Sequence, residues 1–360
     1  MTDLDLANET SAAADAVVEK VFASVLGGME VLSIALGDRL GFYTLLAQGP
    51  LTPDDLAAQA GTDARWTREW LEQQAVVGYL TVTDGRFALA PGVAETLAQP
   101  EALTTMAPAA RMIAAAAAQW TRIADAARTG AGLGWREYGP DMFESQADQN
   151  RPQLEQLLPD SWLAQALPDV HRRLAAGERL LVADVGCGGG WASIGLARRW
   201  PSTSYACTVA DGPSVELARS NVERAGLADR VTVHEQDVAA EQPGQTYDLA
   251  LAVECIHDMP RPVPVLAAMR EMVGEDGHVL VVDEKVADEF TPPGDEVEQL
   301  MYGFSILICL PDGMSGADSA ATGTVIRRST MQRYAREAGF ADAEVLPVEH
   351  DLWRFYALTR

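Results

Sequence analysis

The spacing of apolar residues changes character near residue 179 of the 360-residue chain. Before this point apolar residues recur mostly at intervals of three and four, which predicts amphipathic helices. After it, short apolar runs rich in β-branched residues alternate with helical patterns, which is typical of a parallel sheet whose strands are joined by helices. The pattern predicts an α/β fold, in which a doubly wound, mostly parallel sheet of seven strands follows an N-terminal helical region.

Seven segments of the C-terminal half are predicted as strands, and we expect one domain over residues 176–360 to be built around them. The predicted strands are 180–184, 204–209, 231–234, 249–253, 279–283, 343–347 and 353–358.

The N-terminal part begins with a long apolar helical pattern over residues 16–46. Three glycines, Gly27, Gly28 and Gly37, are expected to mark a bend or an end there. A helix of this length is more than a small domain needs for its own core, so it predicts a homodimer that exchanges N-terminal helices.

Residues 51–89 predict two short helices and a hairpin. Thr52 is placed to cap the first helix, the second begins near Asp63, and Asp84-Gly85 is a strong hairpin signal. Helix, helix and hairpin in this order form a winged-helix pattern. We therefore predict a winged-helix domain over residues 1–95, followed by a helical linker and cap over residues 96–175.

A winged-helix domain can bind DNA, or it can serve dimerisation and cover a substrate. The charge of the chain distinguishes these two functions. Residues 1–100 hold five basic and 14 acidic residues, a net charge of −9, and the whole chain has a net charge of −25. DNA binding needs a basic face, and anionic lipid heads would also be repelled. The charge therefore favours dimerisation and capping of a small-molecule substrate, with neither nucleic acid nor membrane as a partner.

Composition places the chain among compact soluble proteins, with 48% hydrophobic and 22% charged residues. No segment is expected to approach the ~20 apolar residues that a membrane helix needs. Residues 1–10 hold three acidic residues and no basic one, unlike a targeting peptide, so a cytoplasmic location is expected. Four cysteines stand singly without a CxxC pair, which indicates reduced thiols and predicts no metal site.

The strongest chemical signal follows the first predicted strand, where Asp184-Val185-Gly186-Cys187-Gly188-Gly189-Gly190 leads into a helix. Glycines at alternating positions permit a tight turn and let a ligand approach bare backbone beside free N–H groups. A dinucleotide fingerprint would need glycine or alanine where Trp191 stands, which weakens a pyrophosphate interpretation.

This segment and the residues after it resemble the class I methyltransferases that use S-adenosylmethionine (SAM). The similarity continues in order through 213–219, 229–231, 237–238, 247–249 and 277–279. Segments near Tyr302, Gly323 and Trp353 are similar to those of a bacterial subgroup with an N-terminal winged helix. The resemblance implies a Rossmann-like methyltransferase fold with SAM as the cofactor.

The resemblance also implies which residues hold SAM. Gly186, Gly188 and Gly190 would border its methionine part, Asp237 and Val238 its adenine. Asp184 would support the loop or the amino-acid end of SAM, and Glu254 would lie at the cofactor.

One position departs from the family pattern. The family has a carboxylate at the end of the second strand for the ribose hydroxyls, but a count without gaps places Val209 there. Ribose hydroxyls buried without partners would cost about 1–3 kcal/mol each. Asp211, two residues on, is predicted to substitute if the strand extends that far.

A second candidate site, Glu254 to Pro260, directly follows the fourth predicted strand. Its His257-Asp258 pair is similar to the pair of small-molecule O-methyltransferases in which the histidine removes the acceptor proton. His257 and Asp258 are therefore predicted as catalytic. The competing interpretation is that His257 only closes a loop, because many methyltransferases need no more than alignment of the reactants.

Two functions remain open at this point. The first is a SAM-dependent methyltransferase that acts on a small molecule, with O-methylation of natural-product type in secondary metabolism as the expected reaction. The second, motivated by Val209, is a methyltransferase-fold biosynthetic enzyme, such as a cyclase or isomerase, that has lost or repurposed methyl transfer.

Overall fold

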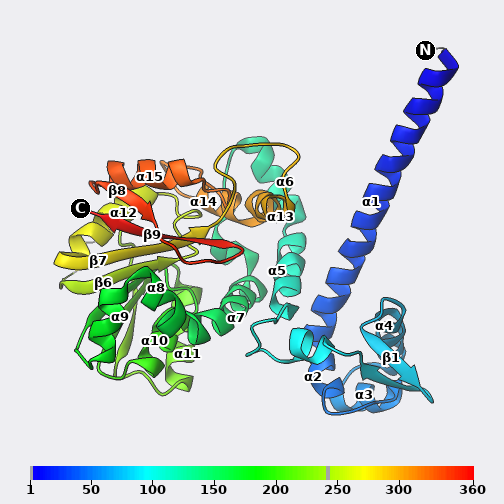
Figure 1. The fold of residues 1–360 in the computed structure, drawn as a ribbon. Helices are drawn as coiled ribbons and strands as arrows, with labels where there is room; N and C mark the ends of the chain where they lie inside the picture. The colour runs from blue at the N-terminus through cyan, green and yellow to red at the C-terminus, as the bar shows by residue number, and fades with distance from the viewer. Residues whose placement is uncertain (1–2, 241–243) are drawn as a thin grey trace. The chain divides into compact units, whose positions relative to one another are not determined.

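The computed structural model describes residues 3–240 and 244–360, with side chains described from residue 12 onward. The chain divides into two compact units, one that ends at Ala114 and one that runs from Ala115 to Arg360 (Figure 1). The helical segment expected over 96–175 contributes to both units, since the boundary falls inside it.

The first unit opens with one long helix, α1 (Asp3–Arg39). The predicted bend at Gly27 and Gly28 is wrong: the helix passes through both, and a Cβ on either would meet nothing within 4 Å. Gly37 serves packing instead, because a Cβ there would lie 2.2 Å from the Trp70 ring. The helix ends at Arg39, before Gly41 adopts φ of 70°.

The expectation that no segment is apolar enough for a membrane helix also needs correction. Residues Ala12–Arg39 reach a mean hydropathy of 1.5 over an 18-residue window, which passes the test for a membrane span by length and composition. Alanines between the aliphatic residues keep this average high, although glycines and polar residues interrupt the apolar run. Such a helix near an N-terminus is weak evidence for a membrane.

The rest of the first unit has the predicted order of helix, helix and hairpin. Thr52 Oγ1 accepts a hydrogen bond from the Asp55 N–H at the start of α3, and Asp63 caps α4. The hairpin turns at Asp84 and Gly85, both with positive φ, as a tight two-residue turn requires. The elements after α1 are α2 (Phe42–Leu46), α3 (Pro53–Ala60), α4 (Ala64–Val76), β1 (Leu80–Thr83) and β2 (Arg86–Leu89).

A helical stretch separates this hairpin from the large sheet. Its members are η1 (Ala94–Ala98), α5 (Ala107–Ala118), α6 (Trp120–Thr129), η2 (Trp135–Tyr138), α7 (Pro140–Gln156), η3 (Leu158–Trp162), α8 (Leu163–Ala166) and α9 (Pro168–Ala175).

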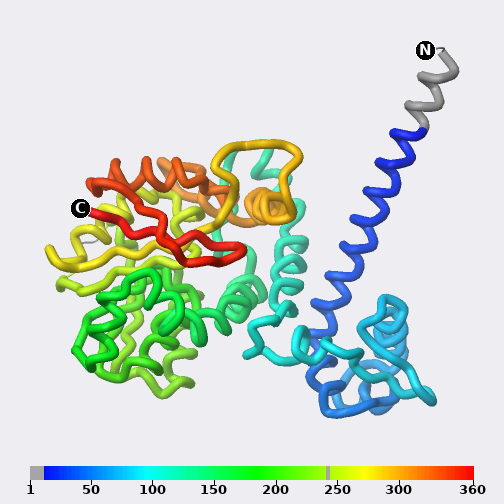
Figure 2. The backbone as a smooth tube through the Cα atoms, in the orientation of Figure 1, coloured from blue at the N-terminus to red at the C-terminus, as the bar shows by residue number. Residues whose placement is uncertain are grey.

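The second unit contains the predicted seven-stranded sheet, in the order β5-β4-β3-β6-β7-β9-β8. Its strands are β3 (Leu181–Val185), β4 (Ser204–Val209), β5 (Val231–Glu235), β6 (Tyr247–Val253), β7 (Val273–Glu284), β8 (Asp342–Val345) and β9 (Trp353–Thr359). The first five run parallel, whereas β9 lies antiparallel between β7 and β8. Figure 2 shows this last strand in red beside β7. The predicted fold class is confirmed.

Helices cover both faces of the sheet, because alternate residues of each strand point to opposite sides. Val182 and Leu251 face a cluster that includes residues of α9, α10 (Trp191–Arg199) and α11 (Gly212–Arg224). Ala183 and Ala252 face the other cluster, with α12 (Pro262–Met272) and α15 (Arg328–Glu337). Between β7 and α15 lie α13 (Glu296–Phe304), η4 (Ser305–Cys309) and α14 (Leu310–Gly313).

Candidate active site

The glycine loop connects β3 to α10 at the carboxyl edge of the sheet. Gly186, Gly188 and Gly190 have φ of 69°, 50° and 78°, a conformation that residues with a Cβ rarely adopt. A Cβ on Gly186 would lie 2.7 Å from Cys255 Sγ, so this glycine allows the β6 loop to pack against the turn. A Cβ on Gly188 would meet nothing within 4 Å, so the space over the loop is open to a ligand.

Asp184 lies beneath this loop and joins β3 to α10. Its Oδ2 accepts hydrogen bonds from the Ser193 N–H (3.2 Å) and from Ser193 Oγ (2.8 Å). Burial raises the pKa of Asp184 to about 6. These contacts make Asp184 a support of the loop, which is one of the two roles expected for it.

Asp211 is the candidate for the ribose carboxylate, on the condition that the second strand extends to it. β4 ends at Val209, so this condition is not met. Asp211 instead caps α11, where its Oδ1 accepts a hydrogen bond from the Ser214 N–H at 3.0 Å. It is thus held at the start of the helix that follows β4, at the same edge of the sheet as the glycine loop.

Asp237 and Val238 follow β5 at the same edge. Val238 is buried, whereas Asp237 is exposed. An oxygen of Asp237 lies 2.7 Å from a guanidinium nitrogen of Arg261, which sequence reasoning did not single out. The ion pair joins the β5 loop to the start of α12.

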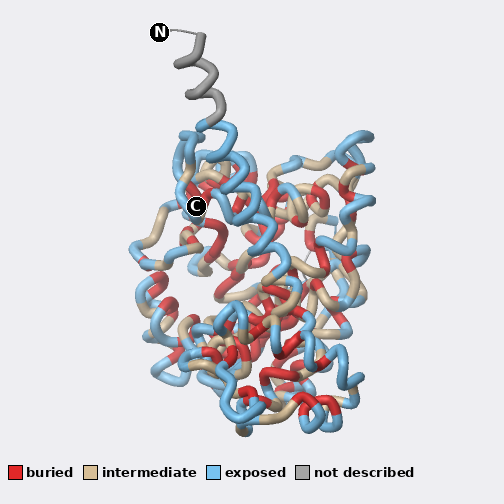
Figure 3. The backbone as a smooth tube through the Cα atoms, turned by 90° about the vertical axis from the view of Figure 1, so that its right-hand side faces the viewer, coloured by how far each residue is buried: buried red, intermediate tan, exposed pale blue. Residues whose placement is uncertain are grey.

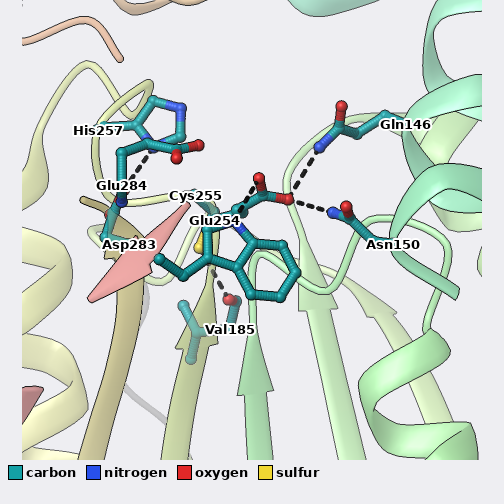
Figure 4. Close-up of polar contacts among 9 residues, drawn as sticks. Gln146, Asn150, Val185, Glu254, Cys255, His257, Asp283 and Glu284 are labelled. Carbon is teal, nitrogen blue, oxygen red and sulfur yellow. Dashed lines mark hydrogen bonds and ion pairs between the residues drawn. The ribbon is translucent and has the colours of Figure 1, made fainter. Parts of the chain in front are cut away.

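His257, in the loop after β6, makes a close polar contact with a carboxylate from the neighbouring strand. Its Nδ1 lies 2.6 Å from Oδ1 of Asp283, near the end of β7, and both side chains are buried (Figure 4). Burial alone would lower the pKa of His257, but the adjacent Asp283 carboxylate outweighs it and holds the pKa well above its ordinary value. Nδ1 is engaged by Asp283, and the ring also shares a hydrogen bond with the thiol of Cys309 in η4, which an acceptor hydroxyl would have to replace.

Asp258 is not the carboxylate that orients His257. Burial raises the pKa of Asp258 to about 6, while the charge of His257 opposes that rise. The loop of Asp258 packs against α14, where Asp312 accepts a hydrogen bond from the Trp135 N–H at 2.7 Å. Burial, together with the negative charge of Asp258, raises the pKa of Asp312 to about 8.

Glu254 lies at the centre of a hydrogen-bond network. Its Oε1 accepts from the Trp353 indole N–H at 2.8 Å, and its Oε2 accepts from the amides of Gln146 and Asn150 (Figure 4). Burial raises the pKa of its carboxyl despite these donors. The backbone is also unusual, because Glu254 has φ of 51°, which a residue with a Cβ seldom tolerates away from a functional site.

Glu284 ends β7 and stands opposite Trp353 in the antiparallel pairing of β7 with β9. Its carboxyl lies beside those of Glu254 and Asp283 (Figure 4). Burial and then the charge of Glu254 raise the pKa of Glu284 well above its ordinary value.

The sequence alone identified His257 as a candidate catalytic residue, but it did not identify Asp283 as the carboxylate that holds the His257 ring. The segment Asp283-Glu284 was recognisable as a carboxylate pair at a strand end, but only the sheet order places β7 beside β6 and its Asp283 against His257. The donors to Glu254 carry no motif, since they come from α7 and from the last strand.

Comparison with known proteins gives the same class as this geometry. A family model described as a methyltransferase domain matches residues 182–277. The ubiquinone biosynthesis O-methyltransferase of Ralstonia nicotianae is 31% identical over 195 residues, which cover 51% of this chain and 72% of that relative. The chain belongs to the class I SAM-dependent methyltransferases.

Solved structures share the fold over nearly the whole chain. An O-methyltransferase family protein from Burkholderia thailandensis has a TM-score of 0.68 and 17% identity, covering 96% of this chain and 98% of its own. The mitomycin 7-O-methyltransferase MmcR has a TM-score of 0.66 and 22% identity, with 97% and 99% covered. The chain spans less than half of the length of most of the curated relatives that it matches.

The residues present fit SAM as the cofactor. The open space over Gly188, the backbone turn that needs three left-handed glycines and the carboxylate at the start of α11 suit a nucleoside whose amino-acid end lies against bare backbone.

Proposed function

We propose that this chain is a SAM-dependent methyltransferase that methylates a hydroxyl group of a small molecule, with His257 as the general base. The observation that carries the proposal is the buried 2.6 Å contact between His257 Nδ1 and Asp283 Oδ1 at the carboxyl edge of the sheet. The names of the relatives, which include ubiquinone and mitomycin O-methyltransferases, favour O-methyl transfer over the cyclase or isomerase alternative, and the mitomycin enzyme supports an acceptor of natural-product type.

The cofactor would be held by the residues that the sequence singled out. Gly186, Gly188 and Gly190 would border its methionine part, Asp211 would accept the ribose hydroxyls, and Asp237 with Val238 would enclose the adenine. Glu254 would lie at the amino-acid end. When bound, SAM supplies an electrophilic methyl group on a sulfonium.

The chain's own contribution to the reaction is to take a proton from the acceptor. Asp283 accepts the Nδ1 proton of His257, which fixes the ring and leaves Nε2 as the basic atom. A proton taken on Nε2 creates an imidazolium, and the buried Asp283 carboxylate stabilises that charge. Asp258, predicted as the catalytic partner, does not hydrogen-bond the His257 ring. It would act on His257 only through its negative charge.

A matched pair of variants tests the base. His257→Gln should lower kcat by about 10²–10⁴-fold, the usual contribution of a general base, while S-adenosylhomocysteine (SAH) still binds. His278→Gln is the control, since His278 lies in the middle of β7, opposite Leu249 and away from the strand end that carries Asp283. Methyl-labelled SAM with a panel of hydroxylated aromatics gives the readout. Full activity in His257→Gln, or no SAH binding by the folded wild type, would reject the proposal.

We further infer that the winged-helix domain serves homodimerisation through α1. Six of its nine exposed large apolar residues alternate at spacings of four and three, the pattern of a helix that packs along a second helix. The six are Val18, Phe22, Val25, Met29, Leu32 and Leu36, and Val17, Val21 and Leu26 widen this apolar stripe. Figure 3 shows most of this helix as exposed.

Light scattering tests the dimer. Phe22→Glu should convert a dimer to a monomer, whereas Ser24→Glu on the same helix should not, because Ser24 lies outside the apolar stripe. A wild-type monomer would refute the inference, and binding of that monomer to lipid vesicles would assign the apolar stripe to a membrane. The four free cysteines support the expected cytoplasmic, reducing location.

A further inference from the structure

Five carboxyl groups lie near His257, and they come from three segments: the loop after β6, the end of β7 and α14. Glu254 and Asp258 follow β6, Asp283 and Glu284 end β7, and Asp312 lies on α14. Asp283 contacts the His257 ring, and the carboxyls of Glu254 and Glu284 lie beside them (Figure 4).

This cluster lacks the cations that usually balance buried acids. Across residues 3–240 and 244–360, none of the five carboxyl groups forms an ion pair with a lysine or an arginine. The charged partner that is present is His257, which Asp283 already engages. Uncompensated buried charge is costly, so a cluster of this kind either holds protons or receives a cation from a ligand.

Two carboxylate oxygens in the cluster lack a hydrogen-bond donor. Oε2 of Glu284 and Oδ2 of Asp283 are buried and accept no hydrogen bond within the described part of the chain. Glu284 is 5% exposed and its carboxyl points into the space between His257 and Glu254 (Figure 4). Buried polar atoms are nearly always paired, so an orphaned oxygen beside the proposed base points to a ligand group that donates to it.

Glu254 and Glu284 differ in how they are satisfied. Glu254 has three protein donors, from Trp353, Gln146 and Asn150, and is held in place without a ligand. Glu284 stands opposite Trp353 on the neighbouring strand and shares a hydrogen bond with the carboxyl of Glu254, so it holds a proton there. Its Oε2 has no partner among the described residues, so Glu284 is the member of the pair that can exchange this proton for a bound cation.

We propose that the methyl acceptor carries a protonated amine and that Glu284 binds this ammonium group while the acceptor hydroxyl meets His257. The inference rests on the proposed function, because it takes His257 as the base. An ammonium group donates up to three hydrogen bonds and supplies the missing positive charge, whereas a neutral hydroxyl supplies only a donor. The acceptor class is an aminoalcohol or an aminoalkyl phenol.

SAM itself brings a sulfonium and an ammonium group, so it is the competing source of positive charge. Its carboxylate leaves it one net positive charge, and five carboxyl groups exceed what it balances. The two sources differ in a measurable way, because a cation that enters a cluster of protonated acids releases protons to the buffer.

The test uses wild-type enzyme saturated with SAH and two matched probes, tyramine and 4-ethylphenol, which differ only in the amine. Calorimetry in two buffers of different ionisation enthalpy gives affinity and proton release together. We expect tyramine to bind about tenfold more tightly, as one charge-assisted hydrogen bond provides, and to release protons that 4-ethylphenol does not.

The variant Glu284→Gln should bring tyramine to the affinity of 4-ethylphenol and leave 4-ethylphenol unchanged. Glu289→Gln, in the exposed loop after β7, is the control that should keep the preference. Retained SAH affinity in Glu284→Gln shows that the variant is folded and binds cofactor.

Three outcomes would overturn the inference: equal binding of the two probes, binding of neither, or proton release on adding SAM instead of SAH with none on adding tyramine. In the last case the cluster serves the cofactor. Failure of wild type to bind SAH would instead count against the proposed function, so the two proposals fail separately.

Discussion

The two halves of the candidate site differ in the groups that they present to a ligand. At β3 the chain offers backbone: three glycines with positive φ, a helix start and an open space over Gly188. At β6, β7 and α14 it offers side chains: a buried histidine and five carboxyl groups, of which those of Asp283 and Glu284 are buried, with hydrogen-bond donors from distant elements. The first half offers uncharged backbone to a ligand and titrates through the supporting carboxyl of Asp184, whereas in the second half several side chains change charge with pH.

The largest effect that separates the two halves should come from Asp283→Asn. An asparagine amide cannot carry the charge that stabilises the His257 imidazolium, and its N–H₂ can hold the ring in the wrong tautomer. We expect kcat to fall by about 10²–10⁴-fold, with SAH affinity unchanged because the glycine loop is untouched. Single-turnover methyl transfer and calorimetry measure the two quantities, and a parallel loss of SAH binding would mean that the halves are not independent.

The glycine loop is tested by Gly188→Ala against Gly226→Ala. Both glycines have positive φ and both have open space where a Cβ would project, so each substitution should cost a similar ~1–2 kcal/mol of stability. Only Gly188 faces the proposed cofactor, and we expect its variant alone to lose at least about tenfold in SAH affinity. Similar SAH affinities for the two variants would remove the cofactor from this loop.

The two regions also differ in how well the sequence predicts them. The glycine loop, the strands and the order of elements follow from local patterns, because a left-handed turn needs glycine and a buried strand needs a run of apolar residues. The Asp283 contact and the Trp353 donor depend on which strands become neighbours, and no local pattern in residues 283 or 353 reports that. Asp211 lies at this edge because it caps α11, and not because β4 extends to it.

The pH dependence of methyl transfer should follow the second half of the site. The neutral form of His257 is the base, and its pKa is held above the ordinary value, so kcat should keep rising with pH beyond the usual histidine range. In Asp283→Asn the remaining activity should reach its plateau at lower pH, because the carboxylate that favours the imidazolium is gone. An unchanged inflection in that variant would assign the titration to another group.

The smallest expected effect is on stability. The pKa of Asp312 is raised to about 8, so the folded chain binds more protons than the unfolded chain between about pH 4 and 8. The free energy of unfolding therefore falls as pH rises through this window. Asp312→Asn should match wild type near pH 4 and have the higher Tm near pH 9, by about 2–4 °C for each kcal/mol recovered. The exposed Asp276→Asn is the control and should shift Tm equally at both pH values.

The last strand has a consequence for how the protein matures during synthesis. β9 follows every other strand in sequence, yet it occupies an interior place in the sheet, between β7 and β8, and brings Trp353 to Glu254. While the ribosome still holds these residues, β8 has no partner and the carboxylate of Glu254 lacks its indole donor. The hydrogen bonds to Glu254 can therefore be completed only after β9 has been translated. Until then the candidate active site of the nascent chain is incomplete.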